Sequence, residues 1–171
     1  MQTKSLTIFL TTALISFSSF DALSQTCEDY IPDEWQDSRY TDNNNQTITD
    51  NTTELMWKKC SEGLSGNDCN VGSVTTHTWK GALDMGGSSF AGYSDWRLPN
   101  IKELGTLVKR NCYTLAINEI MFPNTPSSSF WSSSLNANDS DLVWQRGFNY
   151  GHTYSGFKGA SDRVRLVRLG K

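Results

Sequence analysis

Few side chains in this sequence could carry out catalysis. The chain has two histidines, His77 and His152, and neither lies in a metal-ligand spacing such as H-x-x-x-H or H-E-x-x-H. No cysteine follows Cys112, so the end of the chain offers no thiol nucleophile. An enzyme needs a nucleophile, an acid–base pair or a bound metal. The sequence therefore predicts neither catalysis nor a cofactor.

Two groups of charged residues have structural explanations. Asp95, Arg97 and Glu103 lie at an expected strand-to-helix corner, and charge-assisted hydrogen bonds would fix that corner. Asp139 and Asp141 could bind a hard cation through carboxylate oxygens, although exposed turn carboxylates need no ion. We expect no catalytic role for the first group and no metal site at the second.

The segment 136–163 has the composition of a contact surface. Its turns use almost only Asn, Asp, Ser, Gly, Ala, Thr, Tyr and His. Tyr supplies rigid amphipathic area, while Ser, Gly and Asn supply adaptable hydrogen bonds. In a strand over 142–150, Trp144 would point to one side, and Gln145 and Asn149 to the other side, which we expect to face the ligand. The predicted ligand-binding residues are Asn138, Asp139, Gln145, Arg146, Asn149, Tyr150, His152, Tyr154 and Lys158.

The same end of the chain is basic, although the formal net charge of the whole chain is −3. Residues 142–171 contain six Lys or Arg against one Asp, a net charge of +5. A basic region attracts anionic partners at short range. Arg165 and Arg168, together with four tryptophans in apolar segments, are expected to belong to the scaffold. The four are Trp57, Trp79, Trp96 and Trp131.

The first 24 residues predict a signal peptide. Lys4 precedes an uncharged apolar run that ends at Phe20, shorter than the roughly 20 apolar residues of a spanning helix. An uncleaved N-terminal anchor is the alternative. Cys27 lacks the preceding pattern of a lipid-modified cysteine, and no later run is apolar enough to span a bilayer. We expect a chain that is exported, not lipid-anchored, and without a membrane span after cleavage.

Four cysteines remain after that cleavage, and an even number in an exported chain favours disulfides. Cys60 and Cys69 flank one short loop, so we pair them with each other and join Cys27 to Cys112 by elimination. A zinc site is the alternative use of these thiols, but the sequence contains no C-x-x-C.

Short strands and two helices must position these residues. An acidic, irregular lead-in over 25–38 precedes a single domain over 39–171. Asn- and Asp-rich turns separate β-prone runs and predict an antiparallel meander. Later β-prone runs follow the helical region. The runs are 39–41, 46–49 and 55–57, then 130–134, 142–150, 152–158 and 163–169.

Helical spacing occurs twice. Trp79, Ala82 and Leu83 indicate a short amphipathic helix that ends before Gly86. The second helix has Pro99 in its expected first turn and apolar residues on one face, with basic residues on the other. Its apolar positions are Ile101, Leu104, Leu107 and Val108, and its basic positions include Lys102, Lys109 and Arg110. Helices set within short strands predict an α+β fold.

Residues 95–104, DWRLPNIKEL, resemble the signature of the Lcl C-terminal domain family. Other blocks of that family are matched in the family's order, so the resemblance covers about residues 39–169. These blocks are 39–42, 47–51, 55–57, 91–93, 122–125, 130–134 and 164–168.

The resemblance implies a C-type-lectin-like or formylglycine-generating-enzyme-like architecture, in which late strands and loops form the ligand face. Many members join a cysteine after the first helix to one in the closing block. Here those places hold Met85 and Leu166, so that bridge must be absent, and apolar packing together with the other two bridges must hold the closing strand. The reactive late cysteines of the formylglycine-generating branch and the motifs of calcium-dependent lectins are also absent from this sequence.

The resemblance further implies an exported bacterial module, secreted or periplasmic, that binds ligands in the manner of an adhesin. A sulfated or acidic glycan is the leading ligand, since the domain of a collagen-like adhesin in this family binds sulfated polysaccharide. The alternative is a variable receptor of a diversity-generating retroelement that binds protein ligands through 136–163. We expect no nucleic-acid partner.

Overall fold

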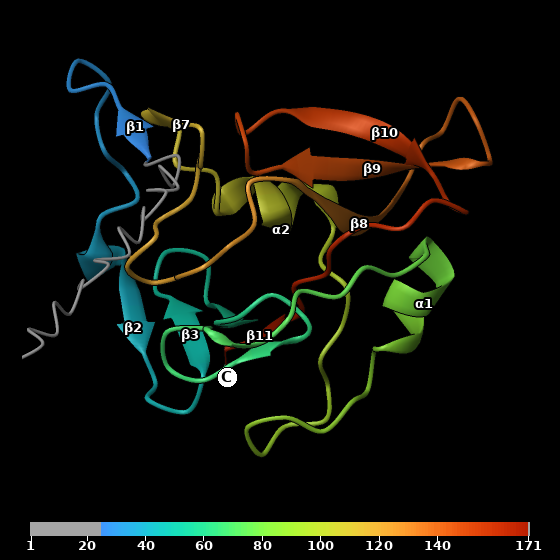
Figure 1. Cartoon of the computed structure of the whole chain (residues 1–171), viewed down its shortest axis with the longest axis horizontal. Coiled ribbons are helices and arrows are strands. Elements are labelled where there is room, and N and C mark those ends of the chain that lie inside the picture. The colour runs from blue at the N-terminus through green and yellow to red at the C-terminus, as the bar shows by residue number, and fades with distance from the viewer. Residues whose placement is uncertain (1–24, 171) are drawn as a thin grey trace, which may run out of the picture.

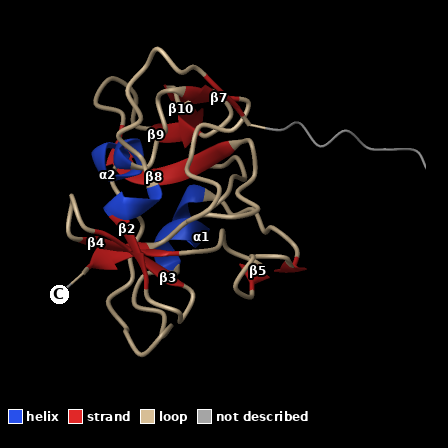
Figure 2. Cartoon of the chain, turned by 90° about the vertical axis from the view of Figure 1, so that its left-hand side faces the viewer, coloured by secondary structure: helices blue, strands red, loops and turns tan. Residues whose placement is uncertain are grey.

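The computed structural model describes residues 25–170, and the expected signal peptide over 1–24 lies outside them. It contains two main antiparallel sheets and two short helices, which confirms the α+β prediction. Figure 1 shows the three-stranded sheet above α2 and the four-stranded sheet below it, and Figure 2 shows the same two layers from the side. The helices are α1 (Trp79–Asp84) and α2 (Ile101–Thr106), with a 3-10 turn η1 (Asp37–Arg39).

The four-stranded sheet contains the expected meander and the closing strand. Its order is β11-β4-β3-β2, with every neighbouring pair antiparallel. Val167 pairs with Trp57, so the two ends of the domain meet in this sheet. The strands are β2 (Tyr40–Asp42), β3 (Thr47–Asp50), β4 (Leu55–Lys58) and β11 (Val167–Leu169).

The three-stranded sheet has the order β10-β9-β8. Two small two-stranded sheets complete the fold, β1 with β7 and β5 with β6. The strands are β8 (Ser129–Leu135), β9 (Leu142–Gly147) and β10 (Thr153–Phe157), and in the small sheets β1 (Thr26–Cys27), β7 (Cys112–Tyr113), β5 (Leu64–Ser65) and β6 (Val71–Gly72).

Two buried apolar clusters hold the layers together. One joins α2 and the segment after it to both sheets, through residues such as Leu104, Trp57 and Phe130. The other joins β9 and the closing block through Val143 and Leu166, among others. Leu166 is completely buried, which confirms that apolar packing stabilises the closing block without the family's additional bridge.

The start of α2 differs from the prediction. Pro99 precedes the N-cap residue, Asn100, and is not in the first helical turn. The Asn100 side chain accepts hydrogen bonds from the N–H groups of Lys102 and Glu103, and the Glu103 carboxylate accepts one from the N–H of Asn100 at 2.7 Å. This capping box fixes the first turn. The helix ends at Thr106, so the following basic residues lie beyond it.

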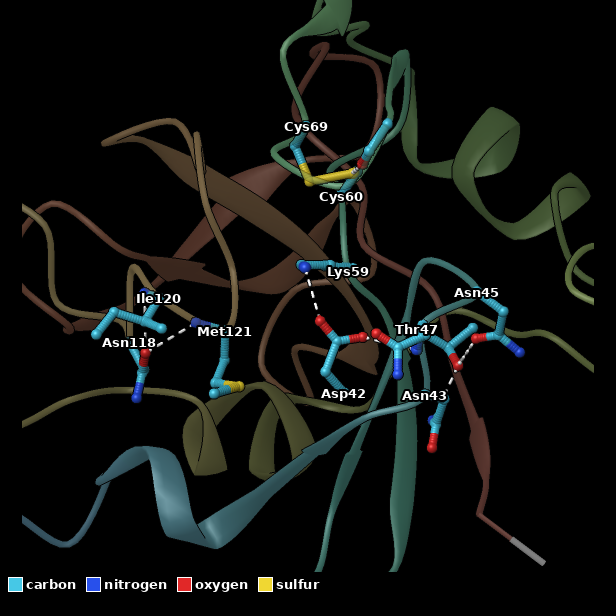
Figure 3. Close-up of polar contacts among 12 residues, drawn as sticks. Asp42, Asn43, Asn45, Thr47, Lys59, Cys60, Cys69, Asn118, Ile120 and Met121 are labelled. Carbon is cyan, nitrogen blue, oxygen red and sulfur yellow. Dashed lines mark hydrogen bonds and ion pairs between the residues drawn. A yellow bond between two sulfur atoms is a disulfide. The ribbon is translucent and has the colours of Figure 1, made fainter.

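Both predicted disulfides are present, Cys27–Cys112 and Cys60–Cys69. The first ties β1 to β7, and the second closes the loop after β4 (Figure 3). Close to the second, the Lys59 ammonium lies 2.8 Å from the Asp42 carboxylate, an ion pair that joins β2 to the end of β4. Within residues 25–170, no helix is both long and apolar enough to cross a membrane.

Candidate ligand-binding cleft

Five of the predicted ligand-binding residues lie at the two opposite ends of β9. The turn between β8 and β9 carries Asn138 and Asp139, both exposed, and Lys158 joins them because its ammonium donates to the Ser140 carbonyl at 2.5 Å. The turn between β9 and β10 carries exposed Tyr150 and His152 at the opposite end of β9. Because β9 is six residues long, these ends are about 20 Å apart. One small ligand does not contact both.

The prediction that the Gln145 side chain points outward from β9 is wrong. Gln145 is only 3% exposed, and its amide donates to the Asp162 carboxylate at 2.8 Å. Burial raises the pKa of Asp162 above its usual value. The strand alternates as predicted, but Val143 and Gln145 face the second apolar cluster, which leaves Trp144 and Arg146 on the other face. Alternation defines two faces, and neighbouring elements decide which one is covered.

The closing arginines belong to the scaffold, as predicted. The Arg165 guanidinium is fully buried, donates to the Lys58 carbonyl at 2.9 Å, and lies 5.0 Å from the centre of the Phe122 ring. Arg168 donates to the Asp95 carboxylate at 2.7 Å. Part of the positive charge of the C-terminal region therefore lies inside the protein. The region does not form one basic surface.

The charged residues of the DWRLPNIKEL corner also have structural roles, as predicted. The Arg97 guanidinium holds the Glu103 carboxylate through two hydrogen bonds of 2.9 and 2.7 Å. Burial alone would raise the pKa of Glu103, but these bonds and the helix cap lower it below its usual value. Asp95 does not join this pair, because it binds Arg168 across the sheet.

An open cleft of about 480 Å³ lies between the lead-in, α2 and β9, with one edge formed by the turn after β3. Its volume falls in the usual range for small-molecule sites. Four basic residues line it against one acidic residue, Glu34. The lining residues are Glu34, Trp35, Arg39, Thr52, Thr53, Lys102, Gly105, Thr106, Arg110 and Arg146.

Arg146 is the central cation of the cleft. Its guanidinium is half-buried and donates to two backbone carbonyls, Gly151 at 3.1 Å and Ile101 at 3.4 Å. Its Nε is buried and has no hydrogen-bond partner. Burial lowers the pKa of Arg146, and repulsion from Arg110 lowers it further. A Cβ at Gly105 would lie 2.9 Å from this guanidinium, so a larger residue there would shift the arginine away from α2.

Three of the four cations have no acidic partner among the described residues: Lys102, Arg110 and Arg146 form no ion pair there. Arg39 differs because its guanidinium binds the buried Asp50 carboxylate at 2.6 Å. The cleft therefore concentrates positive charge that the protein itself does not neutralise.

The lead-in forms one wall of the cleft and is fixed in place. The Trp35 indole donates to the Thr106 carbonyl at 2.8 Å, and the Arg110 guanidinium lies 5.7 Å from the centre of its ring. Asn118 donates to the Trp35 carbonyl at 2.8 Å, while its side-chain oxygen accepts the two N–H bonds drawn in Figure 3. Lys109 pairs with Asp33 at 2.9 Å.

A second cavity, of about 140 Å³, lies beside the Cys60–Cys69 loop. Its basic group, Lys58, already pairs with Glu62 at 2.9 Å and lies over the ring of Phe90. It therefore lacks the free charge of the larger cleft. No cluster of three or more His, Cys, Asp or Glu side chains in residues 25–170 is arranged to hold a metal ion.

Sequence analysis identified Arg146 but missed the other cations of the cleft. Lys102 and Arg110 were placed only on the outer side of a helix, a pattern typical of any solvated helical face. Trp35 was assigned to an irregular lead-in. These residues come together only through the docking of that lead-in, which no local pattern predicts.

Comparison with known proteins identifies the family. The family model of the Lcl C-terminal domain matches residues 46–168, which is most of the chain. No curated protein matches the chain. The matched region contains α2 and the three-stranded sheet, while Glu34, Trp35 and Arg39 of the cleft precede it. The chain belongs to the Lcl C-terminal domain family.

Proposed function

We propose that this chain is an exported, non-catalytic, adhesin-like module that binds an acidic glycan, foremost a sulfated one, in the cleft around Arg146. The observation that carries this proposal is the set of three cations around one cleft that form no ion pair within residues 25–170. A guanidinium group can bind two oxygens of one carboxylate or sulfate group through two parallel N–H···O bonds. An anion bound there would also relieve the repulsion between Arg110 and Arg146.

Three further features support the proposal. Membership of the family is consistent with a lectin-like or adhesin-associated role. The two disulfides suit an oxidising compartment outside the cytoplasm, secreted or periplasmic, as does the signal peptide predicted over 1–24. We assign the α+β domain to the C-type-lectin-like or formylglycine-generating-enzyme-like architecture as part of the same proposal.

Charge removal tests the cleft. In the mature chain with both Lys102→Ala and Arg110→Ala, the affinity for a heparin-derived octasaccharide should fall about tenfold or more, because each hydrogen bond to a charged group contributes about 1.5 to 3 kcal/mol when buried, and less when exposed. The binding should also become less sensitive to salt. Isothermal titration calorimetry at several salt concentrations measures both quantities.

A single variant serves as the control. Lys80→Ala removes an exposed charge from α1, outside the cleft, and should bind like the wild type. Equal losses in all variants would indicate non-specific attraction and contradict a site in the cleft. Unchanged binding in the double variant would contradict it as well.

A variable receptor for protein ligands is the second candidate. It is favoured by the exposed Tyr150 and His152 rings, which stack with their centres 6.1 Å apart at the turn after β9. Such rigid aromatic area is typical of adaptable binding surfaces. A near-copy of the coding sequence for 136–163 beside the gene, differing mainly at adenines, would support this candidate, and its absence would exclude it.

A further inference from the structure

A partly exposed tryptophan, Trp144, lies next to the cleft on the face of β9 that also carries Arg146. Trp144 is packed against neither apolar cluster, although its neighbours Val143 and Gln145 are buried. In the β9–β10 pairing, Leu142 lies opposite Phe157, and Ser155 lies opposite Trp144. The rings of Trp144 and Phe157 are therefore diagonal neighbours on one face.

Beyond Arg146, this face carries apolar side chains that are exposed to different degrees. Phe157 is 67% exposed, and Leu142 and Trp144 are partly exposed. We call these three residues the aromatic platform. Contiguous exposed apolar side chains can mark a ligand-binding surface.

The aromatic platform continues directly into the cleft. Trp144 and Arg146 are two positions apart on β9, so they share a face and lie about 7 Å apart along the strand. Arg146 itself lines the cleft. A ligand that leaves the cleft along β9 therefore passes from unpaired cations onto aromatic rings.

We propose that the aromatic platform is a second subsite that stacks against sugar rings of the same acidic glycan whose anionic groups bind in the cleft. This inference rests on the proposed function and specifies its ligand further. A pyranose ring has an apolar C–H face that packs on an aromatic ring, while its sulfate or carboxylate groups need cations. From Arg146 to Leu142 the strand covers about 13 Å. The ligand is therefore an extended segment of a polysaccharide, and a lone anion or one terminal sugar would not fill the site.

The test uses the mature chain and a heparin-derived octasaccharide, with affinity measured across a series of salt concentrations. Trp144→Ala should weaken binding about three- to tenfold, as expected for the loss of one aromatic contact. The salt dependence of the affinity of Trp144→Ala should match that of the wild type, because no charge is removed. Trp144→Phe should retain most of the affinity.

Two more variants test the second ring of the platform and control for the loss of an exposed apolar side chain. Phe157→Ala removes a largely exposed ring, so the fold should be kept and binding should weaken in the same way. Leu169→Ala removes an equally exposed apolar side chain from β11 in the other sheet and should have no effect. Thermal unfolding of each variant identifies any loss of folded protein.

The outcomes separate this inference from the proposed function. If Trp144→Ala and Phe157→Ala bind like the wild type while the Lys102 and Arg110 double variant does not, the aromatic platform is overturned and the cleft stands. A changed salt dependence in Trp144→Ala would also overturn the platform. So would sedimentation showing a wild-type dimer that Trp144→Ala converts to a monomer, since the rings would then form an interface between copies of this chain. An octasaccharide that does not bind the wild type would overturn both proposals.

Discussion

At the scale of single residues, Arg146 and Arg39 show two ways to hold a guanidinium in one cleft. Arg39 has a carboxylate partner, Asp50, at 2.6 Å. Arg146 has only two backbone carbonyls and keeps a buried Nε without a partner. A buried donor left unsatisfied costs about 1 to 3 kcal/mol. A bound anion would give the Arg146 guanidinium the charge partner that it lacks among the described residues, whereas Arg39 already has one.

The single acidic residue of the cleft provides a gain-of-affinity prediction. Glu34 lines the cleft and would repel an anionic ligand. In Glu34→Gln, the affinity for the octasaccharide should rise about two- to fivefold at low salt, because exposed charge interactions contribute about 0.2 to 1 kcal/mol. The increase should disappear at high salt.

Asp68→Asn is the matched control for this change. Asp68 is exposed and carries the same charge, but it lies in the Cys60–Cys69 loop, away from the cleft. If both variants gained affinity equally, the increase would reflect net charge alone, and Glu34 would have no special place in the site.

At the scale of elements, the lead-in over 25–38 forms part of the proposed binding site. It contributes Glu34 and Trp35 to the cleft, and its first strand, β1, is joined to β7 by the Cys27–Cys112 disulfide. The disulfide closes a loop across 85 positions of sequence. A disulfide that closes a long loop restricts the unfolded chain more than one that closes a short loop. A disulfide typically contributes about 2 to 4 kcal/mol to the free energy of unfolding.

Removing this disulfide should therefore lower both stability and binding. In the double variant Cys27→Ser and Cys112→Ser, the unfolding temperature should fall by several degrees and the affinity for the octasaccharide should fall as well, because the wall that holds Trp35 loosens. The double variant Cys60→Ser and Cys69→Ser opens a loop away from the cleft and should lose stability with little change in affinity. Calorimetry of unfolding and of binding separates the two effects. Unchanged affinity without Cys27–Cys112 would contradict a structural role of the lead-in in the site.

The elements themselves were largely predictable, because their signals are local. Turn residues separate β2, β3 and β4, and helical spacing marks α1 and α2. The start of α2 was misplaced because Pro99 suits a first turn, whereas the Asn100 cap fixed the actual start. The inward direction of Gln145 was missed for a different reason. A polar side chain is usually exposed, but here Asp162 supplies a buried partner.

At the scale of the whole molecule, the distribution of charge decides function more than its total. The formal net charge is −3, yet the cleft is lined by four basic residues and one acidic residue. Part of the negative charge of the acidic lead-in is neutralised within the protein, since Asp33 pairs with Lys109. Conversely, Arg165 and Arg168 of the basic C-terminal region are buried. Sequence could identify a basic end, but it could not show that three chain segments combine their cations at one cleft.

Residue-by-residue mapping of the bound octasaccharide tests the central claim most directly. Backbone amide chemical shifts of the mature chain would be followed during titration with the heparin-derived octasaccharide. The largest changes should occur at Trp35, Gly105, Thr106 and Arg110 around the cleft, and the Cys60–Cys69 loop, which lies away from the cleft, should stay nearly unchanged. Changes centred on 136–141 and Lys158, with none around the cleft, would contradict the account.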